Sequence, residues 1–230
     1  MSLYLIPTFL SENIDVLPHS VLDIARSLDE FIVENEKSAR QFLKSIHTIV
    51  DQNKLIFHLL NEHTSVSDIS ILKDILKKKK DIGLLSEAGC PAIADPGAVL
   101  VKIAHENNIK VVPLTGPSSI LLALMASGMN GQFFIFHGYL PREAGLLRKK
   151  IISLENDALK KNQTQIFIEA PYRNQKLLEE IVNSCTDKTR LCIACNLTSK
   201  EESIHTQTIS YWKRNIPNIN KKPVIFIIGT

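Results

Sequence analysis

Short apolar runs alternate with helix-type patterns through the first half of the chain. The runs lie at residues 3–8, 30–35, 54–60, 81–87 and 110–115. Between the first two, Val21, Ala25 and Leu28 recur at the spacing of one helical face. Five apolar strands alternating with helices predict a mostly parallel sheet that helices cover on both faces.

Local signals predict where two of these helices begin. Ser65 with Asp68 three residues later matches a capping box. Asp95 is expected to cap the helix after the fourth strand, with Pro96 at its first helical position. The lysines at 77–80 lie at the end of the helix that Ser65 opens, and a helix C-terminus favours cations. We therefore expect these lysines to form a solvated helix end rather than a phosphate-binding site.

The second half repeats the pattern less regularly. A helix is expected over 118–127, then a strand within 132–141, a long lysine-rich amphipathic segment, and a strand at 164–170. A helix from Arg173 follows, and its predicted buried residues are Leu177, Leu178, Ile181 and Val182. The last strands, 189–198, 203–212 and 223–229, lack long helices between them, so part of this sheet should be antiparallel. The fold class is α/β, with domains at 1–116 and 117–230.

Composition narrows the classes of protein. Of 230 residues, 44% are hydrophobic and 22% charged, which is typical of a soluble globular protein. The net charge of +3 permits nucleic acid as a partner without demonstrating it. The first ten residues have no basic lead and contain an early proline, and the longest apolar runs are too short to span a membrane, so we expect a cytoplasmic protein without membrane contact.

Cysteine and histidine do not predict a metal site. Cys192 and Cys195 form a CxxC, but residues three apart on a strand point to opposite faces, so burial as small apolar residues is expected. The seven histidines show no ligand spacing, and no GxSxG surrounds any serine.

Polar and Gly/Pro residues gather where the first five strands end. They lie at 7–8, 34–36, 61–63, 87–91 and 115–119. In an open α/β sheet ligands bind beyond these carboxyl ends. Gly89 and Gly116 would let the main chain approach a ligand, and the helix start at Ser118 and Ser119 offers N–H groups to a carboxylate. No GxGxxG or GxxxxGKS follows a strand, which disfavours dinucleotide and triphosphate sites.

Ordered motifs along nearly the whole chain carry a family resemblance. They are YLIPT, SEAGCPAIADPG, VVPLTGPSS, GYLPRE, IFIEAPYR, NLT and ESIH. Together they resemble the tetrapyrrole methylase family of S-adenosylmethionine-dependent methyltransferases. The likeness is closest to the branch that methylates a cytidine ribose 2′-oxygen in small-subunit ribosomal RNA.

The resemblance implies two α/β domains, S-adenosylmethionine bound in the cleft between them, and a homodimer. It assigns to the cofactor Pro7, Thr8, Glu87, Ala88, Gly89, Cys90, Pro91, Ile93, Gly116, Ser118, Ser119, Gly138, Leu197 and Ile227. It places Glu34, His63, Glu169 and Arg173 on the substrate side.

Three segments depart from the family pattern. The loop PTFLSEN after the first strand lacks the family's glycine, Cys195 and Asn196 replace Arg-Glu before Leu-Thr, and Lys222-Pro223 replaces Gly-Glu before the last strand.

Three functions remain open from the sequence. The first is a methyltransferase of ribosomal RNA, with Glu34, His63 or Glu169 receiving the hydroxyl proton and Arg173 clamping phosphate or substrate. Glu169 and Arg173, four apart, could instead pair with each other at a helix start. The second is a methyltransferase of a porphyrin- or corrin-like macrocycle, and the third is a non-catalytic S-adenosylmethionine-binding protein.

Overall fold

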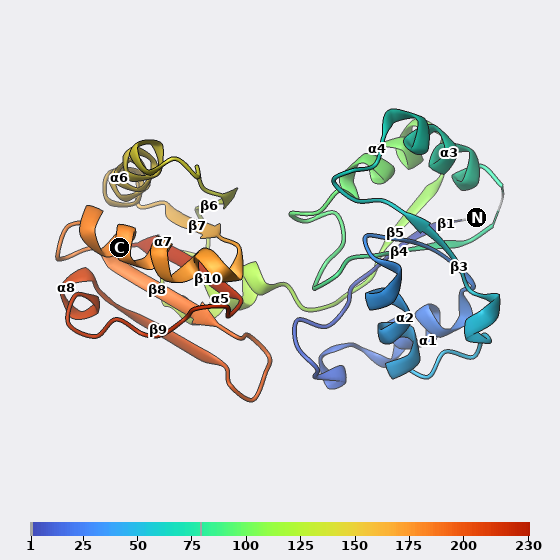
Figure 1. Cartoon of the computed structure of the whole chain (residues 1–230), viewed down its shortest axis with the longest axis horizontal. Coiled ribbons are helices and arrows are strands. Elements are labelled where there is room, and N and C mark those ends of the chain that lie inside the picture. The colour runs from blue at the N-terminus through green and yellow to red at the C-terminus, as the bar shows by residue number, and fades with distance from the viewer. Residues whose placement is uncertain (1, 79) are drawn as a thin grey trace. The chain divides into compact units, whose positions relative to one another are not determined.

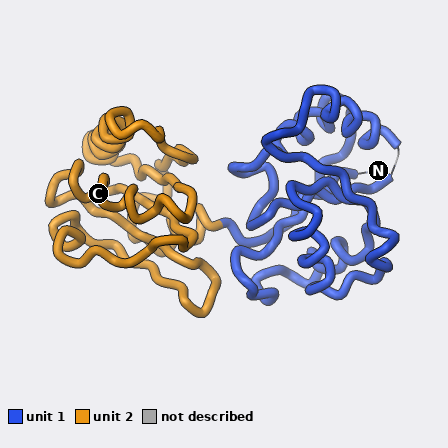
Figure 2. The backbone as a smooth tube through the Cα atoms, in the orientation of Figure 1, with its two compact units in different colours: residues 1–118 blue, residues 119–230 orange. Residues whose placement is uncertain are grey.

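The computed structural model describes residues 2–78 and 80–230, and its chain divides into two compact units. Unit 1 comprises residues 1–118 and unit 2 residues 119–230 (Figure 2). The domains expected from the sequence place the change two residues earlier. Both units are α/β structures built on a five-stranded sheet (Figure 1).

Unit 1 contains a fully parallel sheet, which confirms the predicted fold class. Its strands are β1 (Ser2–Ile6), β2 (Glu30–Val33), β3 (Ile56–Leu59), β4 (Ile82–Leu85) and β5 (Lys110–Pro113), arranged in the order β3-β2-β4-β1-β5. Each of the five strands is shorter than its apolar run, because the residues after the strand turn into the loops that carry polar side chains.

Helices bury both faces of this sheet. They are α1 (His19–Ser27), α2 (Glu36–Ser45), α3 (Val66–Leu76) and α4 (Ala98–Glu106), with short 3₁₀ turns at Ile14–Val16 and Gln52–Lys54. One core joins α1 and α2 to Phe31 and Val33, and the other joins α3 and α4 to Ile32 and Leu84. Alternate residues of β2 therefore enter opposite cores, as strand geometry requires.

The two predicted helix starts have different outcomes. The capping box is confirmed, because Ser65 Oγ accepts the Asp68 N–H at 3.2 Å and Asp68 Oδ2 accepts the Ser65 N–H at 3.1 Å. The prediction for Asp95 was wrong: α4 begins at Ala98, and Gly97 occupies the cap position. Asp95 instead holds the preceding loop, as described below.

Unit 2 contains a mixed sheet, as predicted. Its strands are β6 (Phe134–Tyr139), β7 (Thr164–Ile168), β8 (Arg190–Cys195), β9 (Ser203–Thr208) and β10 (Val224–Gly229), in the order β6-β7-β10-β8-β9. The β6–β7 pair is parallel, and the other three pairs are antiparallel. The predicted strand over 203–212 ends at Thr208, whose hydroxyl caps the short helix α8 (Ile209–Trp212).

The remaining helices of unit 2 are α5 (Ser119–Ser127), α6 (Ala144–Lys161) and α7 (Asn174–Ser184), with a 3₁₀ turn at Pro171–Arg173 before α7. A core of buried side chains joins α6 and α7 to Phe167 and Phe226, whose rings stack at 5.8 Å. The four predicted α7 residues, at 177, 178, 181 and 182, are all in this core. Cys192 and Cys195 are buried on β8, and burial raises the pKa of both thiols.

Candidate functional site

The five parallel strands of unit 1 end at one edge of its sheet, so the loops that follow them lie side by side. Hydrogen bonds tie four of these loops together, those after β1, β2, β4 and β5. We call this set of loops the unit 1 loop edge; it comprises residues 7–12, 34–38, 86–97 and 114–118.

The loop after β4 is anchored to the loop after β1. Thr8 N–H donates to the Gly89 carbonyl at 3.0 Å, and Thr8 Oγ1 donates to the Ser86 carbonyl at 3.2 Å. Ser86 Oγ donates to the same Gly89 carbonyl at 2.8 Å. Gly89 has φ +76°, which an L side chain rarely adopts. The positive φ therefore explains why glycine stands at this position.

Packing against Pro7 requires glycine at position 116. A side chain there would meet the Pro7 ring, with Cγ at 2.2 Å and Cβ at 2.3 Å from the added atom. Pro7 thus fills the space that a side chain at 116 would need, while Gly116 itself is partly exposed, so its contact with a ligand stays a prediction. The Cys90 thiol lies 3.8 Å from the Gly116 carbonyl and 3.5 Å from the Pro117 carbonyl. Because burial raises the pKa of Cys90, this thiol stays protonated and can donate.

Asp95 holds the second half of the β4 loop in a strained form. Ala92 and Ala94 have φ +65° and +60°, each costing roughly 1–2 kcal/mol for a residue with a side chain. Asp95 Oδ1 accepts the N–H groups of Ala92 at 2.8 Å and Gly97 at 2.7 Å. Strain that the surroundings maintain in this way is typical of ligand-binding loops.

We predict that Asp95→Ala destabilises unit 1 by about 1–3 kcal/mol, because two N–H groups lose a charged acceptor. Asp95→Asn keeps an oxygen acceptor and is the control; it should lose less stability.

Burial raises the pKa of Asp95 despite its hydrogen bonds, so ionisation is disfavoured in the folded chain. Folding stability should therefore fall as pH rises past the usual carboxyl range, and Asp95→Asn should remove that contribution. Urea unfolding midpoints across pH measure both effects; equal midpoints for the alanine and asparagine variants would contradict this role.

Glu34 lies where β2 ends, beside the β4 loop. Its Oε1 accepts the N–H of Glu87 at 3.3 Å, and Ser38 Oγ donates to Glu87 Oε1 at 3.3 Å. Partial burial raises the pKa of Glu34, and the nearby carboxylates of Asp95 and Glu87 add to the rise, while the Glu87 hydrogen bond opposes it. A carboxylate that is more basic than usual suits a general base.

A groove of about 390 Å³ borders this arrangement. Thr8, Ser86, Glu87 and Ala88 line one side, and Ser38 and Phe42 of α2 line the other. Its volume is within the range of small-ligand sites. Ile93 is exposed, whereas Pro91 is buried. The exposed main chain and carboxylate at Glu87 and Ala88 are therefore the parts of the loop that a ligand in this groove can reach.

The structure separates His63 from these groups. Its side chain is 84% exposed, and its Nε2 lies 3.6 Å from Oε1 of the similarly exposed Glu62. It lines a second groove of about 460 Å³ between the end of β3 and α3, together with Asn61 and Asp68. Strand order explains the separation, because β3 is the outer strand and β4 lies beyond β2.

Glu169 and Arg173 form an ion pair in unit 2. Arg173 Nη2 lies 2.9 Å from Glu169 Oε2, and the Ala170 N–H donates to Glu169 Oε1 at 2.8 Å. The Glu169 side chain is only 4% exposed, against 21% for Arg173. The pairing that the four-residue spacing allowed is therefore present, and it fixes the guanidinium at the start of α7.

The remaining cofactor candidates differ in access. Gly138 has φ +63° with open space around its Cα. Leu197 is buried, and Ile227 is fully buried in the central strand, paired with Ile166 and Cys192. As arranged, Ile227 packs the core and presents no surface to a ligand. Ser119 begins α5, and Ser118 directly precedes it.

The substituted family positions have local structural roles. Cys195 is in the unit 2 core, where a charged arginine would be buried. Asn196 has φ +52°, a conformation that asparagine tolerates, and its N–H donates to the Pro223 carbonyl at 3.0 Å.

Sequence reasoning did not assign Ser38, Ser86 or Asp95 to the site. Ser86 and Asp95 lie inside the motif SEAGCPAIADPG, which could have indicated them, but their partners are main-chain groups set by the loop conformation. Among residues 2–78 and 80–230 there is no group of His, Cys, Asp or Glu able to hold a metal ion. No helix in that part of the chain is long and apolar enough to cross a membrane.

Comparison with known proteins places the chain in a family. A model of the tetrapyrrole (corrin/porphyrin) methylases matches residues 16–211. The chain is 36% identical over 209 residues to ribosomal RNA small subunit methyltransferase I of Bacillus subtilis, covering 90% of this chain and 68% of that protein. It is 30% identical to the protein of the same name from Buchnera aphidicola, covering 99% and 78%.

Two solved structures share the fold. The methyltransferase CobJ superposes with a TM-score of 0.66 at 14% identity, covering 100% of this chain and 94% of CobJ. Uroporphyrin-III C-methyl transferase from Thermus thermophilus, complexed with S-adenosyl homocysteine, gives 0.59 at 12% identity, covering 100% and 97%.

Proposed function

The chain belongs to the tetrapyrrole (corrin/porphyrin) methylase family and is an S-adenosylmethionine-dependent methyltransferase, and from this premise we propose that it methylates a ribose 2′-oxygen of small-subunit ribosomal RNA. The observation that carries the substrate is the 30–36% identity, over 90–99% of the chain, to proteins named for that RNA. The structure named for uroporphyrin methylation shares only 12% identity, which extends to the fold alone.

We propose the unit 1 loop edge as part of the methyl-donor site. When bound, S-adenosylmethionine supplies an electrophilic methyl group on a sulfonium sulfur. The groove beside Thr8 and Glu87 has room for part of such a ligand, and the exposed residues Glu87 and Ala88 line it. The Glu87 carboxylate suits ribose hydroxyls or an ammonium group. Gly138, Leu197, Ser118 and Ser119 stay predicted contacts.

Glu34 is the proposed general base. Glu34 would accept the 2′-hydroxyl proton as that oxygen takes the methyl group that a bound donor would supply. The Glu87 N–H fixes Oε1 of this carboxylate, which leaves Oε2 for the proton. Positioning of the hydroxyl in line with the methyl group would supply most of the rate, up to about 7–11 kcal/mol.

Arg173 is the proposed phosphate clamp. Glu169 is buried and pairs with it, so Glu169 acts as a positioning residue for the guanidinium in this proposal. His63 is too exposed and too peripheral to share Glu34's role, and we assign it at most a substrate contact.

We further propose a homodimer in the cytoplasm, as the family resemblance implies. Sedimentation velocity of the purified chain measures the oligomeric state, and fractionation of cells that express the chain measures its location.

The function predicts that label from S-adenosylmethionine enters small-subunit ribosomal RNA in assembled particles. A ribose methylated at its 2′-oxygen resists alkaline cleavage, because that oxygen is the attacking nucleophile. One new alkali-resistant position in the RNA, absent when S-adenosylhomocysteine is in excess, is the expected result. Label that enters no RNA while the donor binds in calorimetry would contradict the proposal.

The same assay separates the two alternatives. Label transferred to a porphyrin- or corrin-like macrocycle but not to RNA would support the second function. Donor binding without transfer to either acceptor would support the non-catalytic one. Any methyl transfer by the unmodified protein would exclude the non-catalytic function.

A further inference from the structure

The two units carry opposite net charge. Unit 1 contains 12 Lys and Arg against 15 Asp and Glu, a net charge of −3, whereas unit 2 contains 15 against 9, a net charge of +6. The overall net charge of +3 is therefore the sum of an acidic unit 1 and a basic unit 2. A basic unit attracts polyanions over distances set by salt screening.

The chain has two basic runs, and in the first, at 77–80, two of the lysines form ion pairs. In unit 1, Lys77 lies 4.0 Å from Asp74, and Lys80 lies 2.8 Å from Asp29 and 3.4 Å from Glu30. The hydrogen bond to Asp29 raises the pKa of Lys80. Lys79 lies outside the described residues. These pairs agree with a solvated helix end and leave Lys78 as the described lysine of this run that has no ion pair.

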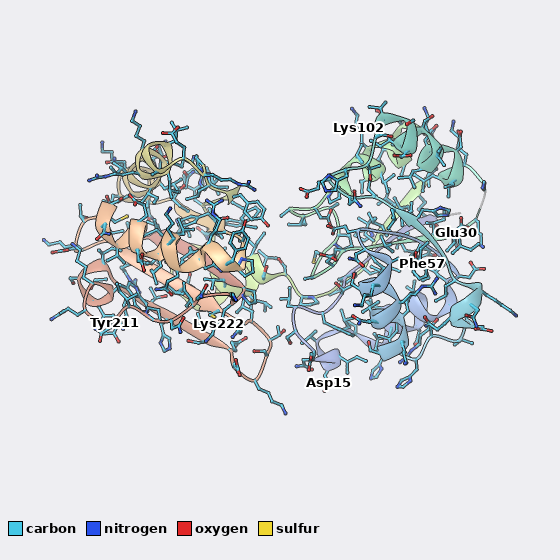
Figure 3. The ribbon with its side chains drawn as sticks, viewed as in Figure 1. Asp15, Glu30, Phe57, Lys102, Tyr211 and Lys222 are labelled. Carbon is cyan, nitrogen blue, oxygen red and sulfur yellow. The ribbon has the colours of Figure 1, made fainter. Side chains whose placement is uncertain are left out.

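The second run, in unit 2, keeps its charge available. We define the α6 basic surface as Arg142, Arg148, Lys149, Lys150 and Lys160. All are exposed except Lys150, which is half-buried, and none has an ion-pair or hydrogen-bond partner among the described residues. Nitrogen-tipped side chains project from α6 in Figure 3.

Acidic side chains near this surface are mostly occupied elsewhere. Asp157 pairs with Lys161 at 2.8 Å. Glu155 is buried and accepts hydrogen bonds from Thr186 and Thr189. Two exposed carboxylates have no described partner: Glu143, before the helix, and Glu179 on α7, which packs against α6. The surface therefore has a clear net positive charge.

Helical spacing orders part of this surface into a stripe. Lys149, Ser153, Asn156 and Lys160 are separated by 4, 3 and 4 positions, so they share the side of α6 opposite the buried residues 147, 151, 154 and 158. From Lys149 to Lys160 the stripe is roughly 16 Å long at 1.5 Å per residue. A nucleic-acid duplex carries several phosphates over that length.

We propose that the α6 basic surface binds the phosphate backbone of structured RNA, and so docks the substrate of the proposed function on unit 2. The occupant is RNA because the surface is positive, polar along its stripe and free of internal pairing. A second copy of the same surface would repel it. This inference rests on the proposed function for the identity of the RNA, but its binding step is measurable without methyl transfer.

The test compares two charge-matched triple variants of the full chain. One is Arg148→Gln/Lys149→Gln/Lys160→Gln in α6, and the control is Lys73→Gln/Lys77→Gln/Lys78→Gln in unit 1. The probe is deproteinised small-subunit ribosomal RNA in a filter-binding titration at several salt concentrations. We expect the α6 variant to bind at least about tenfold more weakly at low salt, with a salt slope reduced by about one for each phosphate that the variant no longer neutralises. The control should bind like the unmodified chain, and calorimetry with S-adenosylmethionine should not distinguish the three proteins.

Each outcome decides the proposal. Equal losses in both variants, or no loss in the α6 variant, would overturn it, as would absence of RNA binding by the unmodified chain. A change in sedimentation of the α6 variant without a change in RNA binding would overturn it in favour of a protein contact. RNA binding that depends on α6, with no methyl transfer to that RNA or to assembled particles, would uphold the surface and count against the proposed function alone.

Discussion

Glu34→Gln is expected to slow methyl transfer by roughly 10²–10⁴-fold, the usual contribution of a general base. The amide cannot accept the hydroxyl proton, but its oxygen can still accept the Glu87 N–H that Glu34 Oε1 accepts. The loop should therefore keep its conformation, and calorimetry should give nearly the same affinity for S-adenosylmethionine. Single-turnover transfer of label at saturating donor and RNA measures the chemical step directly.

The pH dependence gives a second measurement of this role. The base acts when ionised, so the rate should rise with pH through the pKa of Glu34. Because partial burial and neighbouring carboxylates raise that pKa, this limb should lie above the ordinary carboxyl range. Glu34→Gln should remove the limb.

Glu36→Gln is the matched control for this variant. Glu36 is a carboxylate two residues away on the same loop, but its side chain pairs with Arg40 at 2.8 Å and does not line the groove. A rate for Glu34→Gln equal to that of Glu36→Gln, or a pH limb that persists without Glu34, would assign the proton to another group.

Gly116→Ala is expected to disrupt the unit 1 loop edge and to weaken donor binding. The added carbon would lie 2.2 Å and 2.3 Å from two atoms of the Pro7 ring, whose position is fixed by its own backbone. Either the β1 loop or the β5 loop must move, and overpacking of this kind costs about 1–3 kcal/mol. The Thr8–Gly89 bridge follows directly after Pro7, so the displacement should reach the β4 loop as well.

Gly131→Ala is the control, since a side chain at Gly131 meets nothing within 4 Å. Urea unfolding should show a lower midpoint for Gly116→Ala only, and calorimetry with S-adenosylmethionine should show weaker binding for the same variant. Unchanged stability and affinity in Gly116→Ala would mean that the contact with Pro7 does not order the site.

Patterns of local origin were read correctly from the sequence. Alternation of apolar runs with helical spacing predicted the ten strands' places, the parallel sheet of unit 1 and the antiparallel part of unit 2. The capping box at Ser65 was predictable because both partners lie within one helical turn. The family motifs were likewise visible as strings of neighbouring residues, and they led to the methyltransferase family that the comparisons support.

Contacts between distant segments were decided only by the tertiary structure. Asp95 resembled a helix cap, yet its carboxylate binds the N–H of Ala92 in a loop whose φ angles no local pattern predicts. Gly116 was expected to let the main chain approach a ligand, but its packing against Pro7, from the loop after the first strand, was not visible in the sequence.

The two lysine-rich runs looked alike in the sequence, and only the fold distinguishes them. Lys80 meets Asp29 and Glu30 from a neighbouring strand region, while the α6 basic surface forms no ion pair among the described residues. The sequence by itself determined the elements, the two sheet types and the family, because those depend on residue types a few positions apart. Strand order and loop path decide which glycine packs against a neighbouring loop, which carboxylate holds a loop and which cations stay unpaired. Strand order and loop path are set only when segments far apart in the chain pack together.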